Sequence, residues 1–210
     1  MKLTIFGATG VTGKLLVKQA LEKGDQVIAY VRNPAKLDIK HERLTIIQGE
    51  LADEEKIESA LKGSDAVLSV LGPRGGSKSK PLTRGMEIII AVMKKQGVRR
   101  LIVTSTLSAK DPHDLPEFRA KVLVALVRLA MRTAYEEIVS LANTVRASDL
   151  DWTIVRLTLL NNKPKSGKVR AGYLGKGEVG TWISRADIAD FLLKQVTDTK
   201  YLQQAPAISN

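Results

Sequence analysis

The chain has 210 residues, of which 44% are hydrophobic and 26% charged, so it can bury a full core without disulfides or a structural metal. It contains no cysteine, which excludes disulfides, thiolate metal sites and a cysteine nucleophile. Its 33 basic and 22 acidic side chains give a net charge of +11. The basic residues are scattered and only 4% of residues are aromatic, so we expect no specific nucleic-acid partner.

Strands and helices alternate along the chain. The hydrophobic patterns predict strands at Lys2–Phe6, Gln26–Val31, Leu44–Gln48, Ala66–Leu71, Arg100–Thr104 and Trp152–Arg156. They predict helices at Lys14–Lys23, Glu54–Leu61, Arg84–Lys95, Phe118–Arg132, Tyr135–Ala147 and Ala186–Thr197. This alternation predicts an α/β fold with a doubly wound parallel sheet in a three-layer αβα arrangement of the Rossmann type. No repeat or break in composition marks a boundary, so we expect residues 1–210 to form one domain whose C-terminal portion contributes a substrate pocket.

The first predicted strand leads into a glycine-rich heptapeptide, Gly7 to Gly13, and then into a helix. Glycine is needed there because the chain must turn sharply, admit a diphosphate close to the backbone and pack the helix on the strand. The unpaired N–H groups of the first helical turn would then face the phosphates. A tight structural turn is the alternative, but the position at the start of a βαβ unit favours a dinucleotide site. The predicted cofactor-binding residues of this loop are Gly7, Thr9, Gly10, Val11, Thr12 and Gly13.

The second predicted strand is followed by Arg32, about twenty residues after Gly13, near the position where an acidic residue would bind an adenosine ribose. An Asp or Glu there would repel a 2′-phosphate, whereas an arginine binds that phosphate through charge-assisted hydrogen bonds. Arg32 therefore predicts a preference for NADP(H) over NAD(H), and Lys36 adds a second positive charge nearby. The alternative interpretation is a solvated arginine at a strand end.

Ligands of such a sheet collect at the carboxyl ends of its strands, so the residues that follow the other strands are candidates too. Gly72 would let the backbone pass close to the cofactor, and the hydroxyl groups of Thr104 and Ser105 would reach the nicotinamide ribose or a substrate carbonyl. We predict Ser105 as the catalytic residue, acting by positioning. An ordinary loop role is the alternative for each of them. The predicted cofactor-binding residues at these strand ends are Gly49, Glu50, Leu51, Leu71, Gly72, Arg74, Thr104 and Leu157.

Two further segments carry no catalytic motif. Residues 118–131 have apolar side chains at helical spacing, which is typical of a helix that faces the core. The alternatives are a wall of the substrate pocket, a contact between subunits of a homo-oligomer, and, least favoured, a contact with a membrane surface. The glycine-rich stretch from Gly167 to Gly180 is expected to form a loop and a short strand over the ligand cleft.

No metal site is predicted, because neither His41 nor His113 has a metal-ligand neighbour at helical spacing. No apolar run approaches the length needed to span a bilayer, and the first strand begins almost at Met1 without a charged and apolar leader. We therefore expect a cytoplasmic protein with no membrane partner.

Six segments together give the chain a family resemblance: GATGVTG, AYVRNPAKL, QGELADEEKIESALKGSDAVLSVLG, GVRRLIVTST, ASDLDWTIVRL and ISRADIADFLL. Over nearly its whole length the chain resembles the NAD(P)H-binding, NmrA-like branch of the atypical short-chain dehydrogenase/reductases, and within it the flavin and biliverdin-IXβ reductases. The resemblance implies a dinucleotide-binding fold, and either a reductase or a redox-sensing regulator that binds dinucleotide without turnover. Glu50 stands where relatives commonly carry Asp and Leu157 where many carry proline, so contacts at these two positions are expected to differ.

The Tyr-x-x-x-Lys motif of ordinary short-chain dehydrogenases is absent. The positions four residues after the tyrosines hold Pro34, Val139, Gly177 and Ala205. Alcohol oxidation by that motif, in which the lysine lowers the pKa of the tyrosine, is therefore not expected. A reductase can still take its proton from solvent when the acceptor is a flavin, a quinone or a tetrapyrrole. We expect an NADPH-dependent reductase with a small-molecule acceptor, and the alternative is a non-catalytic regulator.

Overall fold

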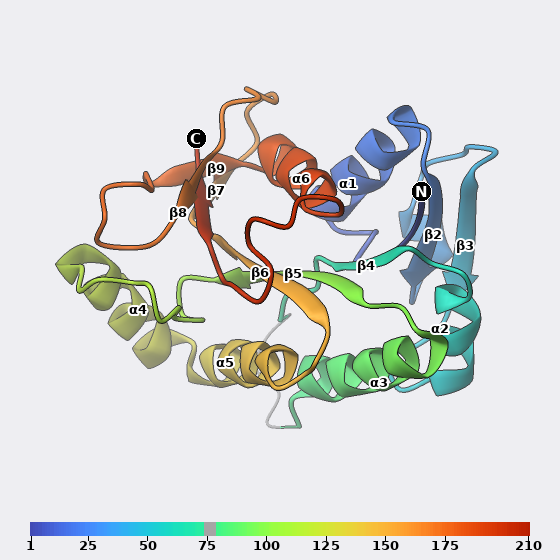
Figure 1. Cartoon of the computed structure of the whole chain (residues 1–210), viewed down its shortest axis with the longest axis horizontal. Helices are drawn as coiled ribbons and strands as arrows, with labels where there is room; N and C mark the ends of the chain where they lie inside the picture. Colours follow the sequence, from blue (N-terminus) through green and yellow to red (C-terminus); the bar gives the residue numbers. More distant parts are fainter. Residues whose placement is uncertain (74–78) are drawn as a thin grey trace.

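The computed structural model describes residues 1–73 and 79–210 and has the predicted α/β architecture. Within these residues, eight strands form a sheet in the order β3-β2-β1-β4-β5-β6-β10-β8, and β7 pairs with β9 in a small second sheet (Figure 1). Neighbours in the large sheet are parallel except β10 and β8. The strands are β1 (Lys2–Phe6), β2 (Gln26–Val31), β3 (Leu44–Gln48), β4 (Ala66–Ser69), β5 (Arg100–Thr106), β6 (Asp151–Leu157), β7 (Leu159–Asn161), β8 (Arg170–Gly172), β9 (Trp182–Ser184) and β10 (Ala207–Ser209).

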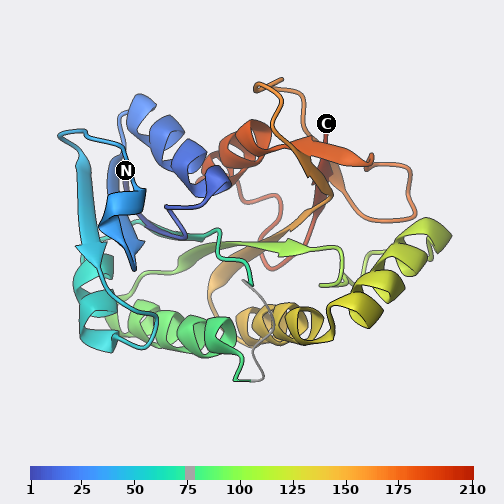
Figure 2. The same ribbon diagram turned by 180° about the vertical axis from the view of Figure 1, so that it is seen from behind.

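Helices cover both faces of the sheet and complete the three layers. The helices α1 (Val11–Glu22) and α6 (Arg185–Lys194) contact each other on one face. The opposite face carries α2 (Glu54–Leu61), α3 (Pro81–Gln96) and α5 (Arg132–Arg146), as Figures 1 and 2 show from the two sides. A short 3₁₀ turn, η1 (Pro34–Lys36), follows β2, and α4 (Phe118–Ala130) precedes α5.

The core follows from alternation along the strands. On β1, Leu3 and Ile5 belong to the cluster under α1 and α6, whereas Phe6 belongs to the cluster on the opposite face. On β5, Ile102 belongs to the cluster under α1 and α6, and Leu101 belongs to the cluster on the opposite face. Because side chains of a strand point alternately to opposite faces, nearly continuous apolar strands of this kind bury both faces and require helices on each.

The predicted element boundaries agree closely with the structure in the N-terminal half. The predicted strands β1, β2 and β3 and the helix α2 have the observed bounds, whereas α1 begins at Val11 and not at Lys14. The short strands β7, β9 and β10 were not predicted. In β10 only three residues pair with the sheet, directly after Pro206, so the segment is too short for a clear period-two pattern.

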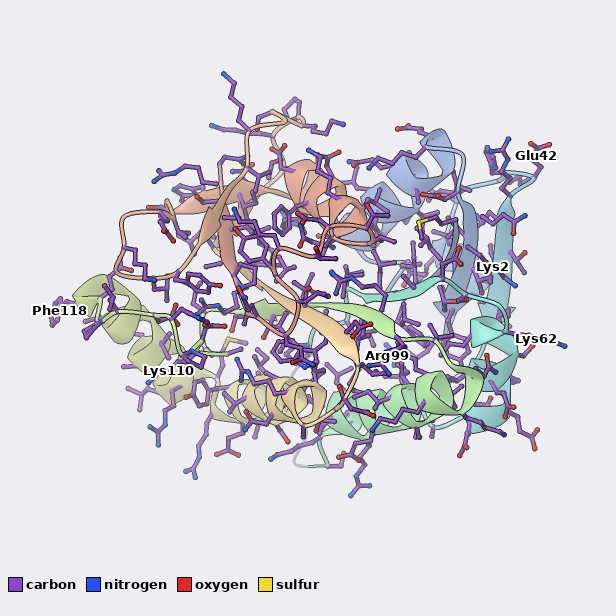
Figure 3. All side chains as sticks on the ribbon, in the orientation of Figure 1. Lys2, Glu42, Lys62, Arg99, Lys110 and Phe118 are labelled. Atoms are coloured by element: carbon purple, nitrogen blue, oxygen red, sulfur yellow. The ribbon has the colours of Figure 1, made fainter. Side chains whose placement is uncertain are left out.

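The apolar stripe of α4 is exposed, so the prediction that it faces the core is wrong. Phe118 is 80% and Leu129 84% exposed, and Val122 and Leu126 are exposed as well. The helix contacts α5 and projects at the edge of the molecule, with Phe118 at its outer end (Figure 3). The physical reason is that α4 extends past the edge of the sheet, as Figures 1 and 2 show, so the helix is less covered than those that pack on the sheet. In the described part of the chain, no helix is both long enough and apolar enough to cross a bilayer.

Candidate functional site

Two adjoining cavities open at the carboxyl ends of the parallel strands. The larger one, of about 770 Å³, extends over the ends of β1, β2 and β3, and the smaller one, of about 200 Å³, over the ends of β4, β5 and β6. Both cavities are lined by Val70, Leu71, Gly72, Leu82 and Glu137, which join them into one elongated depression. The position matches the rule that ligands of doubly wound sheets bind at these strand ends.

The glycine loop has the backbone geometry that the sequence predicts. Gly7 has a φ of +84°, and a Cβ added there would lie 2.9 Å from the backbone carbonyl carbon of Val70 at the end of β4. At Gly13 an added Cβ would lie 2.8 Å from Ala8 Cα, so this glycine allows α1 to pack directly on the loop. At Gly10 the nearest atom would be Gly7 O at an ordinary 3.4 Å. Gly10 is therefore free of any packing requirement, and its open side lines the larger cavity.

The N-terminus of α1 points at this cavity without a side-chain cap. Gly10 occupies the cap position, and no acidic side chain lies in the first turn. The backbone N–H groups of Val11, Thr12 and Gly13 have no hydrogen-bond acceptor among residues 1–73 and 79–210. Unpaired N–H groups at the start of a twelve-residue helix carry partial positive charge and form a binding site for phosphate.

The far end of the larger cavity carries positive charge. The exposed side chains of Arg32 and Lys36 line it, and the cap of η1 between them is made by Asn33, whose side chain accepts a hydrogen bond from Ala35 N at 3.1 Å. Glu50 lines the same end, and its carbonyl oxygen accepts a hydrogen bond from Tyr30 Oη at 2.7 Å. This end of the cavity can hold an anionic group of a ligand against Arg32 and Lys36, and a ring of the same ligand against Leu51.

Tyr30 explains two of the predicted residues in structural terms. A Cβ at Gly49 would lie 2.6 Å from Tyr30 Cζ, so Gly49 makes room for the tyrosine ring beneath the cavity. Burial, together with the negative charges of Asp53 and Glu50, raises the pKa of Tyr30 to about 12. The hydroxyl therefore stays protonated and donates to Glu50. Gly85 of α3, which the sequence analysis missed, likewise makes room for Leu51, since its Cβ would lie 2.7 Å from Leu51 Cβ.

The smaller cavity contains the predicted catalytic residue. Ser105 is only 8% exposed, and its hydroxyl group has no hydrogen-bond partner within the described residues. A buried hydroxyl without a partner is costly, so it is available to a ligand that enters the cavity. The neighbouring hydroxyl of Thr104 donates to Ser69 O at 3.3 Å and is therefore already engaged. Thr12 and Leu157 also line this cavity.

The predicted site residues fall into four groups. Gly7, Thr9, Gly10, Arg32, Lys36, Gly49, Glu50, Leu51, Leu71 and Gly72 line the larger cavity, and Thr12, Thr104, Ser105 and Leu157 line the smaller one. Val11 is 61% exposed and lines neither cavity, and Gly13 is buried beneath the loop. Arg74 lies outside the described residues.

Glu137 is a site residue that sequence analysis missed. It lies on α5, is 2% exposed and lines both cavities. Its Oε1 accepts a hydrogen bond from Leu82 N at 2.7 Å, at the start of α3. In the sequence it follows Glu136 on an amphipathic helix, where a pair of glutamates indicates a solvated face, so only the packing of α5 against α3 reveals it.

The glycine-rich stretch from Gly167 to Gly180 does not line either cavity, so the prediction that it covers the cleft is wrong. Its β8 pairs with β10 at the sheet edge, and Leu174 N donates to Asp114 Oδ1 at 3.0 Å. Asp114 also forms a bidentate pair with the fully buried Arg156, at 2.6 and 2.7 Å. The stretch thus packs against the loop after β5. Among the residues that the structure describes, no cluster of three or more potential metal ligands occurs.

Comparison with known proteins supports this interpretation of the fold and the loop. The family described as NAD(P)H-binding matches residues 7–199. The chain is 26% identical over 215 residues to (4-alkanoyl-5-oxo-2,5-dihydrofuran-3-yl)methyl phosphate reductase of Streptomyces griseus, across 99% of this chain and 67% of that protein.

Two solved structures share the fold at low identity. A wide-type short-chain dehydrogenase/reductase from Veillonella parvula in complex with NADP superposes with a TM-score of 0.77 at 22% identity, covering 100% of this chain and 94% of the other. ChuY, an anaerobilin reductase from Escherichia coli O157:H7, superposes with a TM-score of 0.80 at 18% identity, covering 100% and 97%. Since the family match spans most of the chain and begins at the glycine loop, the protein belongs to the NAD(P)H-binding family.

Proposed function

We propose that the protein is an NADPH-dependent reductase that passes hydride to a small conjugated acceptor of the flavin, quinone or tetrapyrrole type. The observation that carries the proposal is the pair of adjoining cavities: a long one with a phosphate-binding loop and a basic end, and a short one with the unpartnered Ser105 hydroxyl. Family membership supports a nicotinamide cofactor.

The residues present fit such a cofactor. The open space at Gly10 and the unpaired N–H groups of α1 suit the diphosphate. Arg32 and Lys36 suit a 2′-phosphate, which is the basis for proposing NADP(H) over NAD(H). Gly72, whose Cβ would meet nothing within 4 Å, leaves the backbone open to the nicotinamide half. When bound, that half supplies the hydride.

The chain itself contributes orientation and exclusion of water. The smaller cavity is lined mainly by apolar side chains, including Leu82, Leu141, Leu157 and Leu160, which keep water from the reacting ring. We assign Ser105, whose buried hydroxyl group has no partner within the described residues, to donate a hydrogen bond to a carbonyl of the acceptor or to hold the ring in position. The tyrosine and lysine of the ordinary dehydrogenase motif are absent from the sequence, so we assign the acceptor's proton to solvent.

The choice of a conjugated acceptor rests on that missing motif and on the relatives. An acceptor whose reduced form is stabilised by conjugation needs little acid catalysis from the protein. Among the similar proteins, one is described as an anaerobilin reductase and another as a reductase of a furanone phosphate. Both descriptions support reduction of a conjugated substrate without naming the acceptor of this chain.

A turnover assay tests the proposal. NADPH consumption, followed at 340 nm, would be measured with a panel of flavins, quinones and biliverdin, and the reduced acceptor would be quantified in parallel. A Lys163→Ala variant, altered at an exposed residue that lines neither cavity, serves as the matched control and should behave like the parent. Equal consumption of NADPH and acceptor supports a reductase. Tight binding of dinucleotide without turnover on any acceptor would refute it and favour a redox-sensing regulator.

A further inference from the structure

Glu137 is the one charged side chain among the described residues that line the smaller cavity. Every other side chain there is apolar or carries a hydroxyl group. Glu137 also lines the larger cavity, so its carboxylate lies where the two cavities meet, and with 2% exposure it has little access to bulk water. A charge in such a position acts on a ligand through a lower dielectric than a surface charge does.

Glu137 stands at the N-terminus of α3, where the helix has no side-chain cap of its own. Its Oε1 accepts the N–H of Leu82 at the first turn of the sixteen-residue helix α3, where Pro81 has no N–H of its own. The residue before the helix, Lys80, makes no side-chain cap hydrogen bond. Glu137 therefore takes the place of a capping group, and an anion at a helix N-terminus interacts favourably with the helix dipole.

We propose that Glu137 makes the site favour the oxidised dinucleotide over the reduced one. This inference rests on the proposed function, which places the nicotinamide ring in the smaller cavity. The reduced ring is neutral, and the oxidised ring carries one positive charge. With the cofactor bound, Glu137 would stabilise the positive charge that remains on the ring once its hydride, with both electrons of the broken bond, has passed to the acceptor, which would take a proton from solvent. The same carboxylate thus favours hydride donation and tight binding of the product NADP⁺.

The expected effect is large enough to measure. For two unit charges a few ångströms apart at an effective dielectric constant of about 20, the attraction corresponds to about a hundredfold or more in affinity, and contact with solvent through the open cavity mouth lowers it to on the order of tenfold. A purely structural role of Glu137 in holding α3 against α5 would change the binding of both dinucleotides by one common factor. The ratio of the two dissociation constants therefore separates the electrostatic role from the structural one.

The substitution Glu137→Gln tests the inference in the absence of any acceptor. Glutamine keeps an oxygen for the Leu82 N–H and removes the charge. Dissociation constants for NADP⁺ and NADPH would be measured by calorimetry. We expect the affinity for NADP⁺ to fall about tenfold and that for NADPH to change less than about twofold. The matched control Glu50→Gln removes a carboxylate at the other end of the larger cavity and should leave the ratio unchanged, because both dinucleotides are identical there.

A second pair of variants covers a failure of Glu137→Gln to fold, which a thermal melt would reveal. Glu137→Asp keeps the charge and Glu137→Asn removes it at equal length, so the Asp variant should bind NADP⁺ relatively better than the Asn variant. A shift of the ratio without turnover on any acceptor would support this inference and refute the proposed reductase. An unchanged ratio in an active reductase would overturn the inference alone, and failure of the parent to bind either dinucleotide would overturn both.

Discussion

Alanine substitutions at Gly10 and Gly13 should separate cofactor binding from folding within one loop. An added Cβ at Gly10 projects into open space on the larger cavity, with only Gly7 O at 3.4 Å. Its φ of −76° and ψ of 165° are accessible to alanine. Replacing glycine by alanine at a helix cap destabilises the fold by about 0.5 kcal/mol, whereas the lower conformational entropy of the unfolded alanine chain stabilises it by about 0.5 kcal/mol. The free energy of unfolding should therefore change by less than about 1 kcal/mol. The same Cβ occupies space that a diphosphate needs, so NADPH affinity should fall by about tenfold or more.

At Gly13 the added Cβ meets backbone, with Ala8 Cα at 2.8 Å and Gly7 C at 2.9 Å. Backbone atoms cannot rotate away, so overpacking should cost about 1–3 kcal/mol. For a chain of this size, that cost lowers Tm by roughly 2–12 °C. Calorimetric titration with NADPH and thermal melts of both variants give the comparison. Full NADPH affinity in Gly10→Ala, or an unchanged Tm in Gly13→Ala, would contradict the geometry assigned to this loop.

Three further predictions concern Arg32, Ser105 and Asp114. Arg32→Ala should weaken NADPH binding by about 1.5–3 kcal/mol and leave NADH binding nearly unchanged, and equal losses in titrations with both would show that Arg32 does not bind the 2′-phosphate. Ser105→Ala should lower turnover by roughly ten- to a hundredfold, about 1.4–2.7 kcal/mol, with cofactor affinity little altered, and unchanged single-turnover hydride transfer would remove Ser105 from the site. Burial of Asp114 opposes its charge, but hydrogen bonds from Arg156 and from backbone N–H groups outweigh it and hold its pKa below the usual value. A carboxylate whose pKa is lower in the folded than in the unfolded state stabilises the fold at pH values above the unfolded pKa of about 3.9, and this stabilisation is lost as the pH falls below that value. Denaturant melts should therefore show the free energy of unfolding dropping in that range, with a weaker pH dependence in Asp114→Asn.

Local sequence patterns were sufficient to predict the fold class, because each pattern reports on a strand, loop or helix whose residues are consecutive in the chain. The apolar run of β1, the glycine loop and α1 follow one another directly, so the first βαβ unit could be read from periodicity. The stripe of α4 shows where such signals fail. The spacing of Phe118, Val122 and Leu129 indicates one apolar face, but whether a sheet lies beneath that face depends on where the preceding loop places the helix.

The candidate site divides in the same way. Residues at the carboxyl end of a strand, such as Arg32 after β2 and Ser105 in the last residues of β5, could be assigned to the cavities because strand order fixes where strand ends lie. Glu137 could not, because it lies in the middle of a helix and comes near the cavities only through the packing of α5 beside α3. Gly85 is hidden for the same reason, since its small size matters only against Leu51 of another element.

The placement of β10 in the sheet affects how fast the protein can fold. β10 lies between β6 and β8, pairs parallel with β6 and receives support from Arg156, whose Nε donates to Ala205 O at 2.5 Å. These contacts join residues about fifty positions apart, so they form only after a long loop has closed. Pairings of such high sequence separation slow the search for the native state. Leu3 of β1 pairs with Ala66 of β4, which is also distant in the sequence, so pairings in the centre of the sheet carry the same cost as those of β10, and refolding should be slow relative to that of a domain built from local contacts.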